Sequence, residues 1–152
     1  MDQNIRITKE FKFEMAHALP NHEGLCKNVH GHSYVLAVTL LGQAVKDDSR
    51  SDHGMVMDFG DLKKIVFENV INVFDHALVL YKGSSDKLVS ELKDNFAKLI
   101  LVDYHPTSEQ MILDIKDRIQ ANLPENIKLI KLLLRETATA YAEWYASDNV
   151  GS

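Results

Sequence analysis

Two histidines separated by one glycine, His30 and His32, are the residues of this chain whose type and spacing most directly predict metal chemistry. In an extended strand, residues i and i+2 point to the same face, so both imidazoles can reach one point. Gly31 leaves the backbone between them free to adjust. His17 ends an earlier alternating segment, and a hairpin would bring it alongside the other two. Three neutral imidazoles on a rigid sheet, with a fourth position open to substrate, are typical of a catalytic zinc site. A chance His-Gly-His and a satisfied polar histidine at a strand end are the alternatives.

The only cysteine of the chain, Cys26, lies four residues before His30, in the segment CKNVHGH. A lone thiol excludes an internal disulfide framework. Nearby positive charge, from Zn²⁺ and from Lys27, would favour the thiolate and make it a usable base or nucleophile. Spacing alone leaves two other roles open. Cys26 could be a small buried side chain, or a fourth zinc ligand that closes the site and makes it structural.

Two further groups could carry protons or recognise a ligand. Asp75 and His76 adjoin at the end of a predicted helix, and a carboxylate that orients an imidazole is a common acid/base arrangement. Adjacent residues of a regular helix do not face each other, so the pair needs the helix to end there, and a plain surface pair is the alternative. Glu136 stands near the junction of the last two predicted strands. A buried carboxylate there could pair with two N–H groups of a heterocycle, whereas an exposed strand carboxylate is the default interpretation.

Hydrophobic periodicity predicts the elements that position these residues. A helix begins after Asp58 as its N-cap and ends at Asp75, and a second helix covers residues 108–122, with Thr107 and Gln110 fitting a capping box. Between the two helices, LVSELKDNFAKL favours a short helix and LILVDY a strand. Residues 43–54 are polar and turn-rich, which predicts a hairpin loop. The principal predicted strands are residues 5–17, 32–42, 127–135 and 138–146.

The order of two strands, two helices and two strands predicts a single α+β domain over residues 1–152. We expect a four-stranded antiparallel sheet with two helices on one face. Such a sheet leaves its other face and its edges uncovered, so we also expect oligomerisation.

Composition and charge narrow the class of protein further. No stretch approaches 18 consecutive apolar residues, which argues against a membrane-spanning helix. The first residues lack the apolar segment of a signal peptide, so we expect a cytoplasmic location. The net charge of −5 argues against broad nucleic-acid binding but leaves room for a small anionic substrate.

Six segments in a fixed order resemble the successive motifs of one superfamily, that of the 6-pyruvoyl-tetrahydropterin synthases and 6-carboxytetrahydropterin synthases. The match leaves the 82–103 segment, the 43–52 loop and the tail uncovered. Residues 82–103 resemble an insertion, and DHALVLYKG lacks the Asn that many relatives carry after this motif. We expect both departures to affect packing or oligomer geometry. The matching segments are FKFEMAHAL, CKNVHGHSY, GMVMDFGDLKK, DHALV, HPTSEQM and LRETATAYAEWY.

The resemblance implies the tunnelling fold, in which subunits join their sheets into a barrel and the active sites lie between subunits. It implies a homo-oligomer, most plausibly a hexamer of two trimers. It also assigns roles, and the residues of one site need not come from one chain. By this resemblance the zinc ligands are His17, His30 and His32. The general base is Cys26, and its proton partners are His76 and Asp75. The resemblance also makes Glu136 the anchor of the pterin ring and a possible member of the proton relay, and Thr107 and Ser108 further pterin contacts.

The three residues between Cys26 and the His-Gly-His motif resemble the carboxy enzymes of the queuosine pathway, because the pyruvoyl synthases carry a longer gap. The implied lyase reaction converts 7,8-dihydroneopterin triphosphate to 6-carboxy-5,6,7,8-tetrahydropterin and releases acetaldehyde and triphosphate. The alternatives are a 6-pyruvoyl-tetrahydropterin synthase, which eliminates triphosphate and keeps all three side-chain carbons, and a catalytically silent zinc-stabilised scaffold. With the resemblance set aside, a generic zinc hydrolase is the competing interpretation.

Overall fold

The sheet is built around two long strands, β1 (Asn4–His17) and β2 (His30–Gln43), in a computed structural model that describes residues 2–150. The two strands pair antiparallel from end to end, so that His17 lies opposite His30. From Phe11 onward every second side chain of β1 is buried, and the alternation sends the intervening residues to the opposite face. The long predicted strands are therefore confirmed, and the expected domain range of 1–152 extends past the described residues at both ends.

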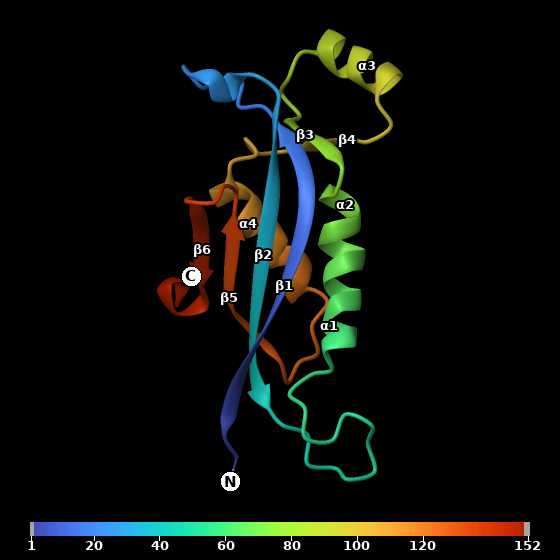
Figure 1. Cartoon of the computed structure of the whole chain (residues 1–152), viewed down its shortest axis with the longest axis vertical. Helices are drawn as coiled ribbons and strands as arrows, with labels where there is room; N and C mark the ends of the chain where they lie inside the picture. Colours follow the sequence, from blue (N-terminus) through green and yellow to red (C-terminus); the bar gives the residue numbers. More distant parts are fainter. Residues whose placement is uncertain (1, 151–152) are drawn as a thin grey trace.

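Four shorter strands extend this pair on both sides (Figure 1). Beyond β2, β5 (Lys128–Arg135) and β6 (Tyr141–Tyr145) continue the sheet antiparallel. Beyond β1, β3 (Ala77–Tyr81) and β4 (Leu99–Val102) continue it in parallel pairings. The order within the described residues is β4-β3-β1-β2-β5-β6, which makes the sheet mixed.

The prediction of a four-stranded antiparallel sheet is wrong for the sheet as a whole, although four of its strands, β1, β2, β5 and β6, do pair antiparallel. The described residues form six strands, because β3 and β4 were not counted in the predicted sheet. The β4 strand corresponds to the weak signal at LILVDY. The β3 strand has only five residues, ALVLY, and a short apolar run cannot be assigned by periodicity alone. It also follows a helix directly, so its parallel pairing with β1 depends on a tertiary contact.

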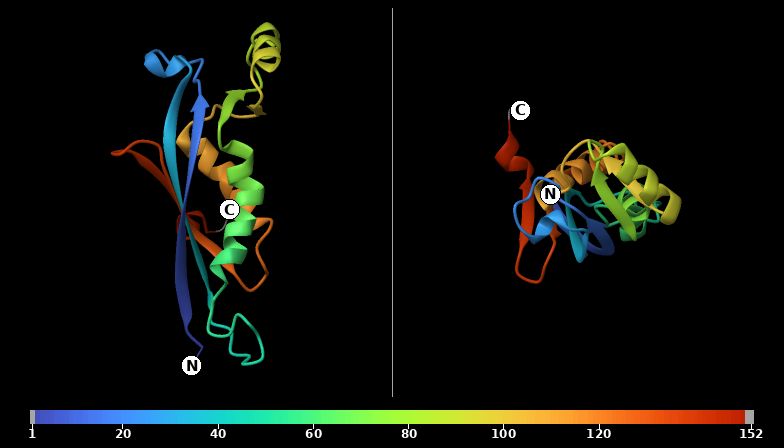
Figure 2. Two further views of the ribbon diagram at one scale, coloured as in Figure 1. Left: turned by 45° about the vertical axis from the view of Figure 1, so that its right-hand side comes forward. Right: turned by 90° about the horizontal axis from the view of Figure 1, so that it is seen from above.

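Two helical elements lie side by side on one face of the twisted sheet, as predicted (Figure 2). The first is a continuous run of α1 (Phe59–Val66), the π-helical turn η2 (Phe67–Ile71) and α2 (Asn72–Phe74), and the second is α4 (Ser108–Gln120). The Asp58 carboxylate accepts a hydrogen bond of 2.6 Å from the Gly60 amide, which confirms it as the N-cap of α1. The core between helices and sheet includes the fully buried side chains Leu36, Leu62, Val66, Val70, Met111, Ile115, Ile119 and Leu132.

The segment predicted as an insertion forms α3 (Asp86–Asn95), which lies beyond the end of the sheet and buries none of its residues (Figure 1). Two short 3₁₀ segments complete the described elements, η1 (Leu25–Lys27) and η3 (Ala146–Asn149). Residues 43–54 do not connect two adjacent strands, so the predicted hairpin loop is wrong. They form a loop between β2 and α1 that folds back on itself, with the Val45 amide bonded to the Met55 carbonyl at 2.9 Å. Within residues 2–150, no helix combines the length and the apolar character needed to cross a membrane.

Candidate functional site

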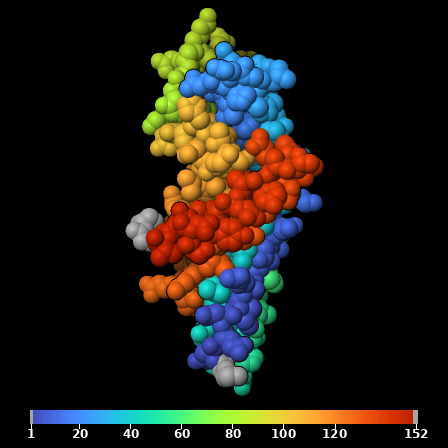
Figure 3. Space-filling model, turned by 90° about the vertical axis from the view of Figure 1, so that its left-hand side faces the viewer, coloured from blue at the N-terminus to red at the C-terminus, as the bar shows by residue number. Residues whose placement is uncertain are grey.

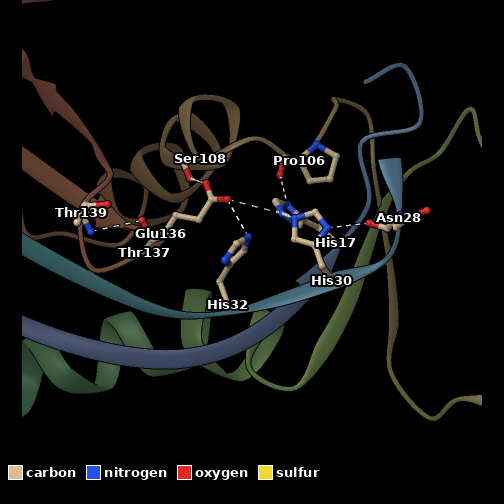
Figure 4. Close-up of polar contacts among 9 residues, drawn as sticks. All are labelled: His17, Asn28, His30, His32, Pro106, Ser108, Glu136, Thr137 and Thr139. Carbon is tan, nitrogen blue, oxygen red and sulfur yellow. Dashed lines mark hydrogen bonds and ion pairs between the residues drawn. The ribbon is translucent and has the colours of Figure 1, made fainter. Parts of the chain in front are cut away.

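The three predicted histidine ligands converge on the helix-facing side of the β1–β2 pair (Figure 4). His17 ends β1 and is 1% exposed, and His30 and His32 begin β2. Strand register and alternation bring the three rings together, with the His17 and His30 ring centroids 4.6 Å apart. The carboxylate of Glu136 joins them. One ligand atom from each of the four residues lies within 4.8 Å of the others, so the group could hold a metal ion.

The hydrogen bonds of His17 and His30 define their tautomers. Nδ1 of His17 lies 2.6 Å from the Pro106 carbonyl oxygen, and Nδ1 of His30 lies 2.7 Å from the Asn28 carbonyl oxygen. A carbonyl oxygen can only accept, so each Nδ1 donates, and in a neutral ring Nε2 then carries a lone pair. Burial lowers the pKa of His17, which favours its neutral form.

The two Nε2 atoms lie 3.0 Å apart, and in these tautomers neither carries a proton to share. Two lone pairs that face each other at this distance repel unless a cation lies between them. Metal-ligating histidines commonly donate their other ring N–H to a backbone carbonyl, as both rings do here. The donor set and its tautomers therefore fit a metal ion.

Glu136 connects the histidines to the first turn of α4. Its Oε1 lies 2.8 Å from Nε2 of His32 and 3.9 Å from Nε2 of His17. Its Oε2 accepts a 2.5 Å hydrogen bond from the buried Ser108 hydroxyl. The short contact with His32 lacks hydrogen-bond geometry, and Nε2 of His32 is buried without a hydrogen-bond partner among the described residues. An unpaired buried nitrogen beside a carboxylate oxygen also fits a shared cation.

The first turn of α4 supports the site in two ways. The Thr107 hydroxyl accepts a 3.3 Å bond from the Gln110 amide, so Thr107 is the N-cap of the helix, as predicted. The cap holds the preceding Pro106 carbonyl against His17 and the following Ser108 hydroxyl against Glu136. The loop over residues 18–29, the start of α4 and the β5–β6 turn lie side by side on one surface of the molecule (Figure 3).

Asp75 and His76 form the predicted pair, with 3.0 Å between Oδ2 of Asp75 and Nδ1 of His76. His76 has a φ of 60°, a conformation uncommon outside glycine, and its amide donates to the Glu14 carbonyl at 2.6 Å. The Glu14 amide donates to Asp75 at 2.9 Å, and this bond is the main cause that lowers the pKa of the Asp75 carboxyl. Both contacts anchor the pair to β1.

The Asp75–His76 pair lies on the other side of the sheet from the histidine cluster. His76 is 78% exposed and lines an open groove of about 880 Å³. The lining also includes Ala16, Gly31 and Ser33, which alternation places on the face opposite the histidine side chains, and His32, which belongs to the histidine cluster and borders the same groove. Among the described residues no contact joins the pair to the histidine cluster.

Cys26 lies in η1, within the loop that leads into β2, and is half-buried. Its carbonyl accepts a 2.9 Å bond from the Leu19 amide, which closes the loop. Within residues 2–150 its thiol is not a member of the group that could hold a metal, and the fourth member of that group is Glu136.

Tyr34 is a residue of this region that the sequence interpretation did not include. It is 1% exposed, its ring lies edge-on to His17 and His32, and its hydroxyl has no hydrogen-bond partner among the described residues. Burial, followed by the negative charge of Glu136, raises the pKa of this phenol. The i+2 spacing from His32 on the same strand was the available signal. The roles of the Pro106 and Asn28 carbonyls as hydrogen-bond acceptors were also not predicted, because every residue has a backbone carbonyl and the residue type does not show which one accepts.

Fold and site together define an α+β protein with a candidate metal centre on the inner face of a mixed sheet. A sequence model described as 6-pyruvoyl tetrahydropterin synthase matches residues 6–147, so the chain belongs to the 6-pyruvoyl tetrahydropterin synthase family. The resemblance to this superfamily is thereby confirmed.

Named relatives support the carboxy branch. The chain is 45% identical over 67 residues to 6-carboxy-5,6,7,8-tetrahydropterin synthase of Haemophilus influenzae, covering 44% of this chain and 46% of that protein. It is 51% identical over 57 residues to the Synechocystis enzyme of the same name, covering 38% and 43%. The matches thus span less than half the length of these two relatives. The solved structure of 6-pyruvoyl tetrahydropterin synthase from Caenorhabditis elegans superposes with a TM-score of 0.66 at 24% identity, covering 95% of this chain and 96% of that one, which shows the shared fold.

Proposed function

We propose that the protein is a zinc-dependent lyase that converts 7,8-dihydroneopterin triphosphate to 6-carboxy-5,6,7,8-tetrahydropterin, acetaldehyde and triphosphate. The observation that carries the proposal is the convergence of His17, His30 and His32 on one point, with the Nε2 atoms of His17 and His30, both without a proton in their tautomers, 3.0 Å apart. The names of the relatives and the short spacing between Cys26 and His30 support the carboxy reaction. Its place in the host would be queuosine and related 7-deazapurine biosynthesis.

Each remaining group of the site has a proposed role. A bound Zn²⁺ would supply Lewis-acid chemistry, which increases the acidity of substrate hydroxyls. Cys26 removes a carbon-bound proton of the side chain, and His76, oriented by Asp75, carries protons to and from solvent. Glu136 accepts N–H groups of the pterin ring, with Thr107 and Ser108 beside it.

The position of the Asp75–His76 pair supports a site shared between copies of the chain. The pair faces an open groove, and among the described residues no contact joins it to the histidine cluster, although His32 also borders that groove. If a second copy of the chain docks at this groove, the Asp75–His76 pair of the first copy would lie beside Cys26 of the second. The edge strands β4 and β6 are open to pairing in the described chain. We propose a closed homo-oligomer, a hexamer of two trimers.

The proposed function is tested by removing and restoring the metal. The protein is stripped with a chelator, then reloaded with Zn²⁺ or left without metal, and each sample receives 7,8-dihydroneopterin triphosphate. Release of triphosphate only from the reloaded sample supports the proposal. Equal release from both samples, or none from either, would contradict it.

The runner-up is a 6-pyruvoyl-tetrahydropterin synthase, which the description of the matching family favours. That enzyme would also release triphosphate but would keep all three side-chain carbons on the pterin. Acetaldehyde, which only the carboxy reaction releases, separates the two.

A further inference from the structure

Glu136 lies where the fourth ligand of a metal would lie. In a tetrahedral zinc site with bonds of about 2.05 Å, ligand atoms are about 3.4 Å from one another. The measured separations fall on both sides of this value: 3.0 Å between Nε2 of His17 and His30, 2.8 Å between His32 and Glu136, and 3.9 Å between His17 and Glu136. Small adjustments would therefore bring a carboxylate oxygen into the coordination shell.

The contact between Glu136 and His32 is short without being a hydrogen bond. Two atoms that face a common third point, and not each other, produce this geometry. Figure 4 shows the carboxylate between the histidine rings on one side and Ser108 on the other. The residue is half-buried, so the carboxylate is partly screened from water and gains by contact with a cation.

Ser108 holds the carboxylate in this position. Its hydroxyl donates to Oε2 at 2.5 Å, which leaves Oε1 directed at the histidines. Ser108 is the first residue of α4, and the positive end of a helix dipole also stabilises an anion there. The backbone of Glu136 is anchored by its amide, which donates to the Ala140 carbonyl at 3.1 Å across the β5–β6 turn. The backbone is thus held in place, so a movement of the carboxylate would have to come from a change of side-chain rotamer that breaks the bond to Ser108.

We propose that Glu136 is a fourth metal ligand in the substrate-free protein and swings off the metal when a substrate hydroxyl takes its place. The carboxylate closes the site against water and other small ligands while no substrate is bound. Its displacement leaves an anion beside the bound substrate, able to accept N–H groups. The displacement step, unlike the ligation, rests on the proposed function, because it needs a substrate with both a hydroxyl and N–H groups.

The ligation is tested with Co²⁺ as the metal probe, because its visible absorption reports the number and type of ligands. The stripped protein, Glu136→Gln and the matched control Glu143→Gln are each loaded with Co²⁺ without substrate. Glu143 lies on β6 of the same hairpin and pairs with Lys131 at 3.5 Å, so its substitution removes the same charge away from the histidines. We expect an altered spectrum in Glu136→Gln only, with a loss of metal affinity of at least about 10-fold, because loss of even an outer-shell partner of a metal ligand typically costs that much.

Two more variants separate ligation from simple charge. Glu136→Asp keeps the charge but withdraws the oxygen by one methylene, and Ser108→Ala frees the carboxylate. We expect Glu136→Asp to change the spectrum as Glu136→Gln does, and Ser108→Ala to weaken metal binding less than either. Spectra and affinities of Glu136→Gln that equal those of wild type would overturn the proposal, as would a wild-type spectrum in Glu136→Asp.

Displacement is tested by adding 7,8-dihydroneopterin to the Co²⁺-loaded wild type, with binding followed separately by pterin fluorescence. We expect the wild-type spectrum to lose its carboxylate ligand as the pterin binds. Pterin that binds without changing the spectrum would overturn the displacement. Absence of pterin binding would contradict the proposed function instead, and the substrate-free spectra would still decide whether Glu136 is a ligand.

Discussion

His17 and His30 are the two residues whose geometry says most about the site. Each donates Nδ1–H to a carbonyl, so their Nε2 lone pairs face each other across 3.0 Å. The strand alternation that placed them was predictable, since His17, His30 and His32 occupy matching positions on two antiparallel strands. The proximity of Glu136 to them was not, because it depends on how the β5–β6 turn meets the start of α4.

His32→Ala should lose zinc while the fold survives. The change removes one of the three proposed nitrogen ligands, and the ring it deletes is not part of the apolar core. We expect zinc content, measured by elemental analysis after dialysis, to fall well below one per chain, with the far-ultraviolet circular dichroism unchanged. His53→Ala, in the exposed loop beside Asp48, is the matched control and should retain the metal. Stoichiometric zinc in His32→Ala would show that the ligand set is wrong.

Cys26→Ala should separate catalysis from metal binding. If the thiol is a general base and not a ligand, its removal should lower turnover by about 10²- to 10⁴-fold and leave zinc affinity unchanged. The absence of Cys26 from the candidate metal group supports this outcome. Turnover of the triphosphate substrate and competition with a chelator measure the two effects. Weaker zinc binding with the same loss of turnover would make Cys26 a ligand.

At the scale of elements, α4 connects the core to the site. Its buried face packs against the sheet, its first residue presents the Ser108 hydroxyl to the site, and the segment just before its N-cap presents the Pro106 carbonyl. The helix and its Thr107 cap were predictable from local sequence, because apolar spacing and capping residues are local signals. The β3 strand was not predictable from local sequence, because a short apolar run forms a strand only where it can pair with another strand, which here is β1.

Thr107→Ala should weaken both the helix and the metal site. Loss of the N-cap costs about 1 kcal/mol of unfolding free energy, since the Gln110 amide loses its acceptor. Fraying of the first turn should also loosen the contacts at His17 and Glu136 and lower zinc affinity. Thr107→Ser retains the capping oxygen and should preserve both properties. Chemical denaturation measures the free energy of unfolding, and chelator competition measures zinc affinity. An unchanged zinc affinity in a destabilised Thr107→Ala would show that the N-cap does not affect metal binding.

For the molecule as a whole, the groove that contains the Asp75–His76 pair is the feature that one chain leaves incomplete. The pair and the histidine cluster occupy opposite faces of one sheet. The open edges could be anticipated from the predicted antiparallel sheet. The separation of the Asp75–His76 pair from the histidine cluster could not be predicted, because it depends on where β3 lies in the sheet. Sedimentation should show a closed oligomer at micromolar concentration, and a monomer would count against a shared site.

Mixing inactive subunits tests the shared site directly. Cys26→Ala and His76→Ala are expected to be inactive alone. If each site takes Cys26 from one chain and His76 from another, random re-association of equal amounts restores both groups in about one quarter of the sites. Activity should reappear after the variants are dissociated and reassembled together. Continued inactivity of verified mixed oligomers would place both groups in one chain's site.

The most direct test of the whole account is the product formed from 7,8-dihydroneopterin triphosphate by the zinc-loaded protein. The reaction is followed by mass spectrometry of the pterin, with acetaldehyde measured by a coupled dehydrogenase. We expect 6-carboxy-5,6,7,8-tetrahydropterin together with an equimolar amount of acetaldehyde. A 6-pyruvoyl product without acetaldehyde would contradict the carboxy reaction, and recovery of intact substrate would contradict the enzyme.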